Sequence, residues 1–357
     1  MTTAMPQSIL VTGGAGFVGS SLAQQFHARG AEVTAMDNLV RNGSELNAER
    51  LRQSAITFIK GDIRHQKDWD ALPKYDLIVD CAAEPSVHAG ATSTPIPVID
   101  NNLNGTVLAL EKARKDDSAF LFLSTSRVYS IQALLDIKLR DTESRFEIDT
   151  LQTLSGLTDD GITEDFSSRT YRSFYGTTKL ASEQLIQEYA AFYGLRAMIN
   201  RCGVIAGPYQ MGKVDQGVTA LWVARHYYKM PLKYIGFGGQ GHQVRDVLHP
   251  DDLFELVQAQ LASVEDWNAD IFNVGGGRAI SFSLAELTDI CRDVTGNSID
   301  IESVPETAAV DVPLYVTDSS RVSAAFGWTP KRSVQTIVQD IHTWIKGDEE
   351  ALRNIFC

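Results

Sequence analysis

The sequence has few cysteines, and none of them lie close together. Four cysteines occur in 357 residues, and they are scattered along the chain as Cys81, Cys202, Cys291 and Cys357. A disulfide framework needs a higher density of cysteines, and a zinc site built on thiolates needs pairs with CxxC spacing. Both are excluded on this count, and scattered thiols are typical of the reducing cytoplasm, where we expect this protein.

Long apolar runs and basic runs are also missing. No stretch approaches the roughly 18 uninterrupted apolar residues of a membrane span, and the start lacks a charged segment followed by an apolar one. Lys and Arg number 32 against 45 Asp and Glu, which gives a net charge of −13. Because such a charge repels nucleic acids and anionic membranes, we expect neither as a partner.

The motifs of two common hydrolase classes are absent as well. The chain has no GxSxG motif for a serine hydrolase and no HExxH motif for a zinc protease. Its seven histidines do not cluster with the spacing of metal ligands. We therefore expect no metal site.

The chain does contain a regular series of short apolar runs. Hydrophobic residues make up 44% of it, enough for a sizeable buried core. Six β-rich runs are each separated by enough residues for a helix: Ile9–Val11, Val33–Met36, Ile56–Ile59, Leu77–Cys81, Phe120–Leu123 and Ala197–Ile199. This alternation predicts an α/β fold with a Rossmann-like, doubly wound parallel sheet.

The alternation decays after residue 203, which predicts two domains. Residues 1–203 form the first, with a long polar excursion at about 130–170, and residues 204–357 form a smaller C-terminal α/β domain that binds substrate. Ser283 and Glu286 have the spacing of a capping box at the start of a helix. We expect the chain to cross back between the two domains.

Glycines crowd the segment VTGGAGFVGS, between the first apolar run and a predicted helix. Glycine costs a strand or a helix about 0.5–1 kcal/mol relative to alanine, so this density needs a physical reason. A tight turn here lets the backbone approach a pyrophosphate, whose charge is stabilised by the free N–H groups at the helix start. A glycine-rich turn without a ligand is the alternative. The residues assigned to the cofactor from this turn are Gly13, Gly16, Phe17, Val18 and Gly19.

An acidic residue identifies the cofactor further. Asp37 ends the second predicted strand, 18 residues after Gly19, where a carboxylate accepts hydrogen bonds from ribose hydroxyls and repels a 2′-phosphate. NAD is therefore favoured, although Arg41 keeps NADP open. Asp62 and Ile63 follow the third strand and are placed to flank adenine, with a plain surface aspartate as the alternative.

Tyr175 and Lys179 lie one turn apart in YGTTK, at the head of a helix that is expected to end at Gly194. A phenol has a pKa near 10, so its use as a base near pH 7 requires about 4 kcal/mol of phenolate stabilisation, which a neighbouring ammonium helps to provide. The same spacing recurs at Tyr209 and Lys213, but Gly207, Pro208 and Gly212 predict a loop there.

Thr125 reinforces the interpretation of the first pair. It lies in LSTSRVY, at the carboxyl end of the fifth predicted strand, where open α/β sheets bind their ligands. Its hydroxyl is placed to bind a substrate hydroxyl beside the tyrosine. A threonine that merely ends a strand is the alternative.

Together these motifs resemble the extended short-chain dehydrogenase/reductases that act on nucleotide-sugars. The resemblance covers essentially the whole chain and rests on TGGAGFVG, the strand-end Asp-Asn, GDI at 61–63, Asn102 before Gly-Thr, Thr125 before Val-Tyr, YGTTK, and QVRDVLHPDD at 243–252. It implies catalysis by Thr125, Tyr175 and Lys179, and a diphosphate contact by Arg245. It also implies cofactor contacts by Asn38, Ala82, Ala83 and Asn102, and substrate contacts by Arg127 and Gln216.

The residues after Thr125 separate the branches of this family. The 4,6-dehydratases carry Asp-Glu there, whereas this chain has Ser126 and Arg127, so the dehydratase interpretation loses its acid and base. The segments DTESRFE, KVDQG and GHQVRDVLH look most like those of the CDP-tyvelose (CDP-paratose) 2-epimerases. Two positions depart from the pattern of the family. Many relatives have an asparagine near the diphosphate where this chain has Val204, and a second diphosphate-binding arginine where it has Ala308.

The resemblance implies an NAD-dependent nucleotide-sugar epimerase that inverts C2 of a CDP-hexose through a transient keto-sugar. Residues 1–203 would then be the NAD-binding domain and residues 204–357 the nucleotide-sugar domain. A 4-epimerase or a net dehydrogenase of the same fold is the first alternative, and a noncatalytic NAD-binding regulator is the second. Relatives commonly pair through helices, so we expect a homo-oligomer, a dimer or a tetramer.

Overall fold

The computed structural model describes residues 6–91, 93–149, 151–213 and 216–357. Thirteen α-helices are assigned in these residues, in the order α1 (Phe17–Ala28), α2 (Ser44–Gln53), α3 (Gln66–Asp70), α4 (Ile96–Ile99), α5 (Gly105–Asp116), α6 (Ile131–Leu135), α7 (Phe174–Tyr193), α8 (Val218–Tyr227), α9 (Pro250–Leu261), α10 (Leu284–Thr295), α11 (Ser320–Phe326), α12 (Val334–Gly347) and α13 (Glu349–Phe356). Within the described ranges, no helix combines the length and the apolar character that crossing a membrane requires.

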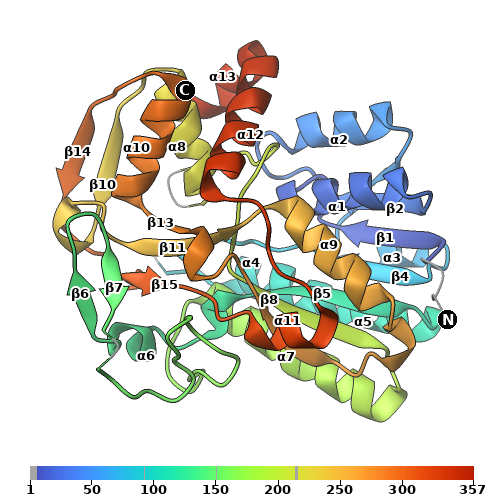
Figure 1. Ribbon diagram of the computed structural model, residues 1–357. Coiled ribbons are helices and arrows are strands. Elements are labelled where there is room, and N and C mark those ends of the chain that lie inside the picture. The colour runs from blue at the N-terminus through green and yellow to red at the C-terminus, as the bar shows by residue number, and fades with distance from the viewer. Residues whose placement is uncertain (1–5, 92, 150, 214–215) are drawn as a thin grey trace.

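A parallel sheet of seven strands forms the centre of the molecule (Figure 1). Its spatial order is β12-β8-β5-β4-β1-β2-β3. The strands are β1 (Ser8–Thr12), β2 (Glu32–Asp37), β3 (Thr57–Lys60), β4 (Leu77–Asp80), β5 (Ala119–Thr125), β8 (Ala197–Cys202) and β12 (Asp270–Val274). The order reverses between β1 and β4, so the predicted doubly wound α/β fold is confirmed.

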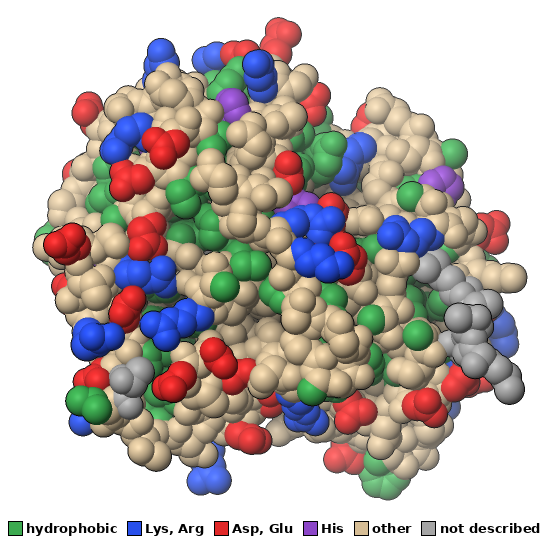
Figure 2. Space-filling view, in the orientation of Figure 1, with side chains coloured by type: hydrophobic (Ala, Val, Ile, Leu, Met, Phe, Trp, Pro, Cys, Tyr) green, Lys and Arg blue, Asp and Glu red, His purple; other side chains and the backbone are tan. Residues whose placement is uncertain are grey.

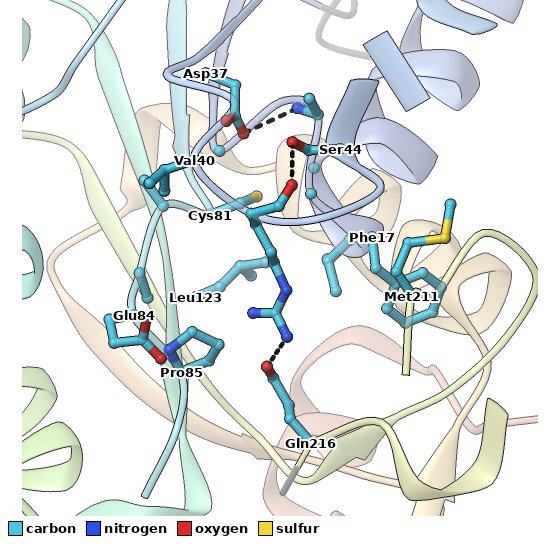
Figure 3. Close-up of a pocket in the computed structure, with 18 of the residues that line it drawn as sticks. Phe17, Asp37, Val40, Ser44, Cys81, Glu84, Pro85, Leu123, Met211 and Gln216 are labelled. Atoms are coloured by element: carbon cyan, nitrogen blue, oxygen red, sulfur yellow. Dashed lines mark hydrogen bonds between the residues drawn. The ribbon is translucent and has the colours of Figure 1, made fainter. Parts of the chain in front are cut away.

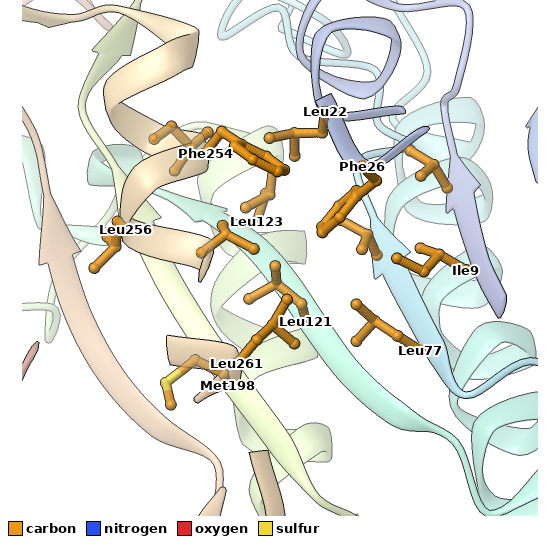
Figure 4. Close-up of a cluster of buried hydrophobic side chains, with 14 of the residues drawn as sticks. Ile9, Leu22, Phe26, Leu77, Leu121, Leu123, Met198, Phe254, Leu256 and Leu261 are labelled. Atoms are coloured by element: carbon orange, nitrogen blue, oxygen red, sulfur yellow. The ribbon is translucent and has the colours of Figure 1, made fainter. Parts of the chain in front are cut away.

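Helices cover both faces of this sheet because alternate strand residues point to opposite faces. Ile9, Leu121 and Met198 pack with Phe26 of α1 and Phe254 of α9 in one buried cluster (Figure 4). The residues between them pack with α3, α5 and α7 on the other face. The six predicted strands are thus confirmed, and β1, β4, β5 and β8 are buried on both sides, whereas β3 at the edge of the sheet is partly exposed.

The seventh strand comes from a late part of the sequence. β12 pairs in parallel with β8, from Asp270 opposite Met198 to Val274 opposite Cys202. α9 and α11 also pack against the first sheet, so residues 250–274 and 320–326 return to the N-terminal half of the fold. The domain boundary at residue 203 stays a prediction.

The remaining C-terminal elements pack around a separate core. β11 (Val244–Leu248) pairs with β9 (Val204–Ile205), β13 (Ser281–Ser283) and β15 (Leu314–Tyr315), and β10 (Leu232–Ile235) pairs with β14 (Ile301–Val304). α8, α10 and α12 form the helical side of this core. α10 begins with the predicted capping box, in which Ser283 and Glu286 bond each other's backbone.

The polar excursion packs in a third, smaller apolar cluster beside β15. It contains α6 and the hairpin of β6 (Leu139–Asp141) and β7 (Phe146–Ile148), and its apolar side chains pack with Val312 and Tyr315. Acidic and basic side chains are interspersed over the face seen in Figure 2.

Candidate active site

A cavity of about 740 Å³ lies at the carboxyl ends of β1, β2, β4 and β5 (Figure 3). This is the place where the strand order reverses, so loops from both halves of the sheet diverge around it. Most of the predicted site residues line the cavity: Gly13, Gly16, Phe17, Val18, Gly19, Asp37, Asn38, Ile63, Ala82, Ala83, Thr125, Tyr175, Lys179 and Gln216.

The glycine turn fits tightly between β1 and α1. Gly13 has φ +59°, and a Cβ on it would lie 2.8 Å from the Cα of Ala82. A Cβ on Gly19 would overlap the carbonyl of Gly13. Gly16 is the N-cap of α1 and offers no side-chain acceptor to the first amides of the helix. Those amides lie at the cavity wall, which suits an anionic group such as a pyrophosphate.

Asp37 presents its carboxylate at the end of β2. The backbone amides of Ala15 (3.2 Å) and Leu39 (2.8 Å) donate to its two oxygens. Burial raises the pKa of Asp37, and these backbone bonds act in the opposite direction. An acceptor held in this way matches the ribose hydroxyls of an adenine dinucleotide.

Asp62 lies behind the cavity wall rather than in it. Arg64 donates to it at 2.6 Å, and Asn38 Nδ2 lies 3.2 Å from Oδ2. The hydrogen bond from Arg64 holds the pKa of the Asp62 carboxyl well below its usual range. Ile63 and Arg64 line the cavity beside it.

Thr125, Tyr175 and Lys179 meet at the inner end of the cavity. Thr125 is the last residue of β5, and Tyr175 lies in the first turn of α7, whose N-cap Ser173 accepts from the amide of Gly176 at 3.1 Å. Lys179 is 2% exposed, and its Nζ donates to the carbonyl of Leu123 at 2.8 Å. The predicted end of this helix at Gly194, in the left-handed conformation, is confirmed.

The electrostatics of these groups favour their neutral forms. Burial raises the pKa of the Tyr175 phenol, while a hydrogen bond with Thr125 and the charge of Arg127 lower it. Burial also lowers the pKa of the Lys179 ammonium, against the attraction of Asp80. Where Lys179 is charged, little solvent screens it in this desolvated place, so its effect on a neighbouring phenolate is strong.

A buried ion pair supports this corner from behind. Arg201 of β8 and Glu183 of α7 form an ion pair at 2.7 Å, and both side chains are less than 10% exposed. Ser124 donates a further hydrogen bond to Glu183, and Arg201 donates to the hydroxyl of Tyr129 at 3.3 Å. No sequence motif indicates this pair, which joins β8 to the helix of Tyr175, while Ser124 joins the strand of Thr125 to the same helix.

Besides Asp62, three predicted residues do not line the cavity. Asn102 is fully buried in a π-helical turn, where its side chain bonds the backbone of Glu84 and the hydroxyl of Thr178. Arg127 and Arg245 lie beyond Thr125 and donate to the carbonyls of Val310 and Val312. Their assigned roles stay predictions.

Gln216 lies on the opposite wall, where its amide oxygen accepts a hydrogen bond from Arg41 across the cavity (Figure 3). Met211 and Ile355, which no sequence motif indicates, also line the cavity. Tyr209 lies in a turn with φ +70°, so the predicted loop for the second tyrosine–lysine match is confirmed. Val214 and Asp215 of that loop lie outside the described residues.

The fold and the cavity define an α/β protein of the dinucleotide-binding class, since the glycine turn, the helix start and Asp37 fit an adenine dinucleotide. The sequence pattern of the NAD dependent epimerase/dehydratase family matches residues 9–275, and the chain belongs to this family. NAD is the cofactor of the family.

Comparison with individual proteins agrees with the family. The chain is 30% identical to a CDP-paratose 2-epimerase of Salmonella typhi, over 94% of this chain and 98% of that protein. It is 27% identical to a UDP-glucose 4-epimerase of Halalkalibacterium halodurans, over 95% and 96% of the two chains. The crystal structure of a Thermus thermophilus UDP-glucose 4-epimerase in complex with NAD has the same fold, with a TM-score of 0.77, 24% identity, and coverage of 95% of this chain and 99% of that one.

Proposed function

We propose that this protein is an NAD-dependent nucleotide-sugar epimerase that inverts C2 of a CDP-linked hexose through a transient keto-sugar. The observation that carries the proposal is the meeting of Thr125, Tyr175 and Lys179 in one cavity with the glycine turn. The 30% identity to a CDP-paratose 2-epimerase over nearly both full lengths supports the choice of C2 and of CDP.

In this proposal Tyr175 exchanges a proton with the hydroxyl of the ring carbon that is oxidised. Thr125 orients that hydroxyl, and the charge of Lys179 stabilises the phenolate, offsetting part of the roughly 4 kcal/mol that a phenol of pKa 10 requires near pH 7. When bound, NAD supplies the acceptor and donor of hydride. The keto-sugar then presents its other face, and Tyr175 returns the proton.

The test is to incubate the protein with CDP-paratose, CDP-glucose, GDP-glucose and UDP-glucose and to follow products by NMR in deuterated water. Inversion at C2 of a CDP-sugar is expected, with no solvent deuterium at the inverted carbon, because the hydrogen leaves and returns as hydride. Deuterium at C2 would instead mean abstraction of a carbon-bound proton. Turnover of none of the four sugars would contradict the proposed substrate range.

A 4-epimerase is the second candidate, because the same three residues would serve it and a UDP-glucose 4-epimerase is 27% identical over 95% of the chain. A galactose-configured product from UDP-glucose would select it. Dehydration is disfavoured, since Ser126 and Arg127 stand where an acid and a base are needed. We propose also that the enzyme is a homo-oligomer, which sedimentation of the NAD-loaded protein tests.

A further inference from the structure

A buried carboxylate that the proposed mechanism does not use lies at the base of the site. Asp80 is the last residue of β4, and its side chain is 1% exposed. The hydroxyl of Thr12 donates to Oδ1 of Asp80 at 2.6 Å, and the hydroxyl of Thr106 donates to Oδ2 at 3.0 Å. Both donors are neutral, so they fix the carboxylate without cancelling its charge.

The parallel sheet places Asp80 next to the ring over which the catalytic lysine lies. Asp80 is the register partner of Phe122 on β5. Such partners lie on strands about 4.8 Å apart, and their side chains point to the same face of the sheet. The Nζ of Lys179 lies 4.2 Å from the centroid of the Phe122 ring. The ammonium and the carboxylate therefore lie over adjacent strands, in one buried layer between the sheet and α7.

The other titratable groups around Lys179 do not supply it with a counter-charge. The groups that face it from β4, β8 and α7 are Asp80, Cys81, Cys202, Tyr175 and Glu183. Glu183 is paired with Arg201 at 2.7 Å, so its charge is already balanced. Burial raises the pKa of both thiols, which therefore stay neutral. The attraction of Asp80 is the largest effect that opposes the desolvation of the ammonium and its lowered pKa.

The π-helical turn Asp100–Asn104 holds the two charged groups in place relative to each other. The hydroxyl of Thr106 is shared between Asp80 and the carbonyl of Asn102, which lies 2.9 Å from it. Nδ2 of Asn102 donates to the hydroxyl of Thr178 at 3.2 Å, and Thr178 directly precedes Lys179 on α7. One network of buried hydrogen bonds thus connects the carboxylate to the helix that carries the lysine, in a place of low dielectric where charges interact strongly.

We propose that Asp80 is the counter-ion of Lys179 and acts as a positioning residue that keeps the ammonium charged beside Tyr175. The inference rests on the proposed function, because it concerns the proton transfer at Tyr175. A buried ammonium is costly unless an opposite charge lies near, and little solvent screens a carboxylate in the same desolvated layer. Because Asp80 acts through Lys179, it sets the pH range in which the phenolate is stabilised.

The first experiment measures the pH profile of kcat with a sugar that the enzyme turns over. Asp80→Asn removes the negative charge and keeps the shape of the side chain. An ammonium that loses a nearby opposite charge releases its proton at lower pH, so kcat of this variant should begin to fall about one pH unit below the wild type. We expect kcat to be about tenfold lower above that pH and less than about threefold lower on the acid side.

Two further variants separate the charge of Asp80 from its packing. Thr106→Val removes one hydrogen bond from the carboxylate but keeps its charge, so any loss of kcat should be the same at every pH. Asp116→Asn removes a carboxylate that pairs with a different lysine, Lys112, at 2.9 Å on α5, and it should leave the pH profile unchanged. If the loss of kcat in Asp80→Asn is also the same at every pH, Asp80 acts through packing and the inference is overturned.

A double-variant cycle tests the same pair without substrate. Urea unfolding of the full-length protein at pH 7 compares Asp80→Asn, Lys179→Met and the variant with both changes. If the two charges compensate each other, the double variant should lose less free energy of unfolding than the sum of the two single losses. Additive losses would overturn the inference. A cycle that shows coupling, in a protein that turns over none of the sugars, would support the pairing of Asp80 with Lys179 while rejecting the proposed function.

Discussion

Asp246 offers a quantitative test of the packing around β11. Its carboxyl is 0% exposed, lies on β11 next to Arg245, and accepts from the amide of Gly277 at 3.1 Å. Burial raises the pKa of Asp246 from 3.8 to about 6, and the contacts with Thr317 and Gly277 offset only part of this. The folded protein therefore holds the proton more tightly than the unfolded chain does.

The consequence is a pH-dependent cost of ionisation. Because the folded-state pKa is the higher one, stability from the protonated group is fully present below about pH 4 and is lost as the pH rises through about 6. One pKa unit corresponds to about 1.4 kcal/mol, so the full cost is about 3 kcal/mol at pH 7 and above. Asp246→Asn removes the ionisation, and we expect a gain in the free energy of unfolding of up to about this size at pH 8, falling to none near pH 4.

Urea unfolding of the NAD-free protein between pH 4 and pH 8 measures this gain. Asp293→Asn is the matched control, because Asp293 is an exposed aspartate on α10, and it should show no pH-dependent difference from the wild type. A difference between Asp246→Asn and the wild type that is the same at pH 4 and pH 8, or a less stable variant at pH 8, would refute the argument from burial.

Two further predictions concern the cofactor and the base. The purified protein should retain NAD(H) and release it on denaturation, and chromatography that finds NADP(H) instead would reject the role of Asp37. Gly16→Leu should abolish the retention of NAD(H), because the leucine side chain would fill the space at the start of α1. The control Gly347→Leu should retain NAD(H), since nothing lies within 4 Å of an added Cβ at that position. Tyr175→Phe should lower kcat by about 10²- to 10⁴-fold with NAD still bound. Tyr209→Phe should change kcat little. A larger loss of kcat in Tyr209→Phe than in Tyr175→Phe would show that the wrong tyrosine is assigned.

Much of the fold is predictable because its signals are local. The inner strands β1, β4, β5 and β8 are short runs buried on both faces. Helix ends carry their own signals, such as the capping box at Ser283 and the left-handed Gly194. β12 is harder to place because its five residues form a strand of ordinary composition. Only its pairing with β8, about 70 residues earlier, assigns it to the first sheet.

The site residues also fall into those that a local sequence signal indicates and those that only the folded structure brings together. Residues that end strands are predictable, since the carboxyl ends of parallel strands meet at one edge, and Asp37 and Thr125 are examples. Ile355 lies on the last helix, where an amphipathic pattern indicates only a helix that packs against something. The pairing of Glu183 with Arg201 depends on how a helix lies across a strand, which no sequence spacing encodes.

The sequence and the structure each give separate information about Arg127. In the sequence it stands where the dehydratases of the family need a base, so it argues against one reaction. In the structure the same position lies between Thr125, the first turn of α7 and the turn at Ala308, so a guanidinium there adds positive charge beside Arg245. A carboxylate at this point could accept a proton, whereas a guanidinium cannot. The position that lacks the residue for elimination chemistry thus still lies against the catalytic elements, with a fixed positive charge in place of a base.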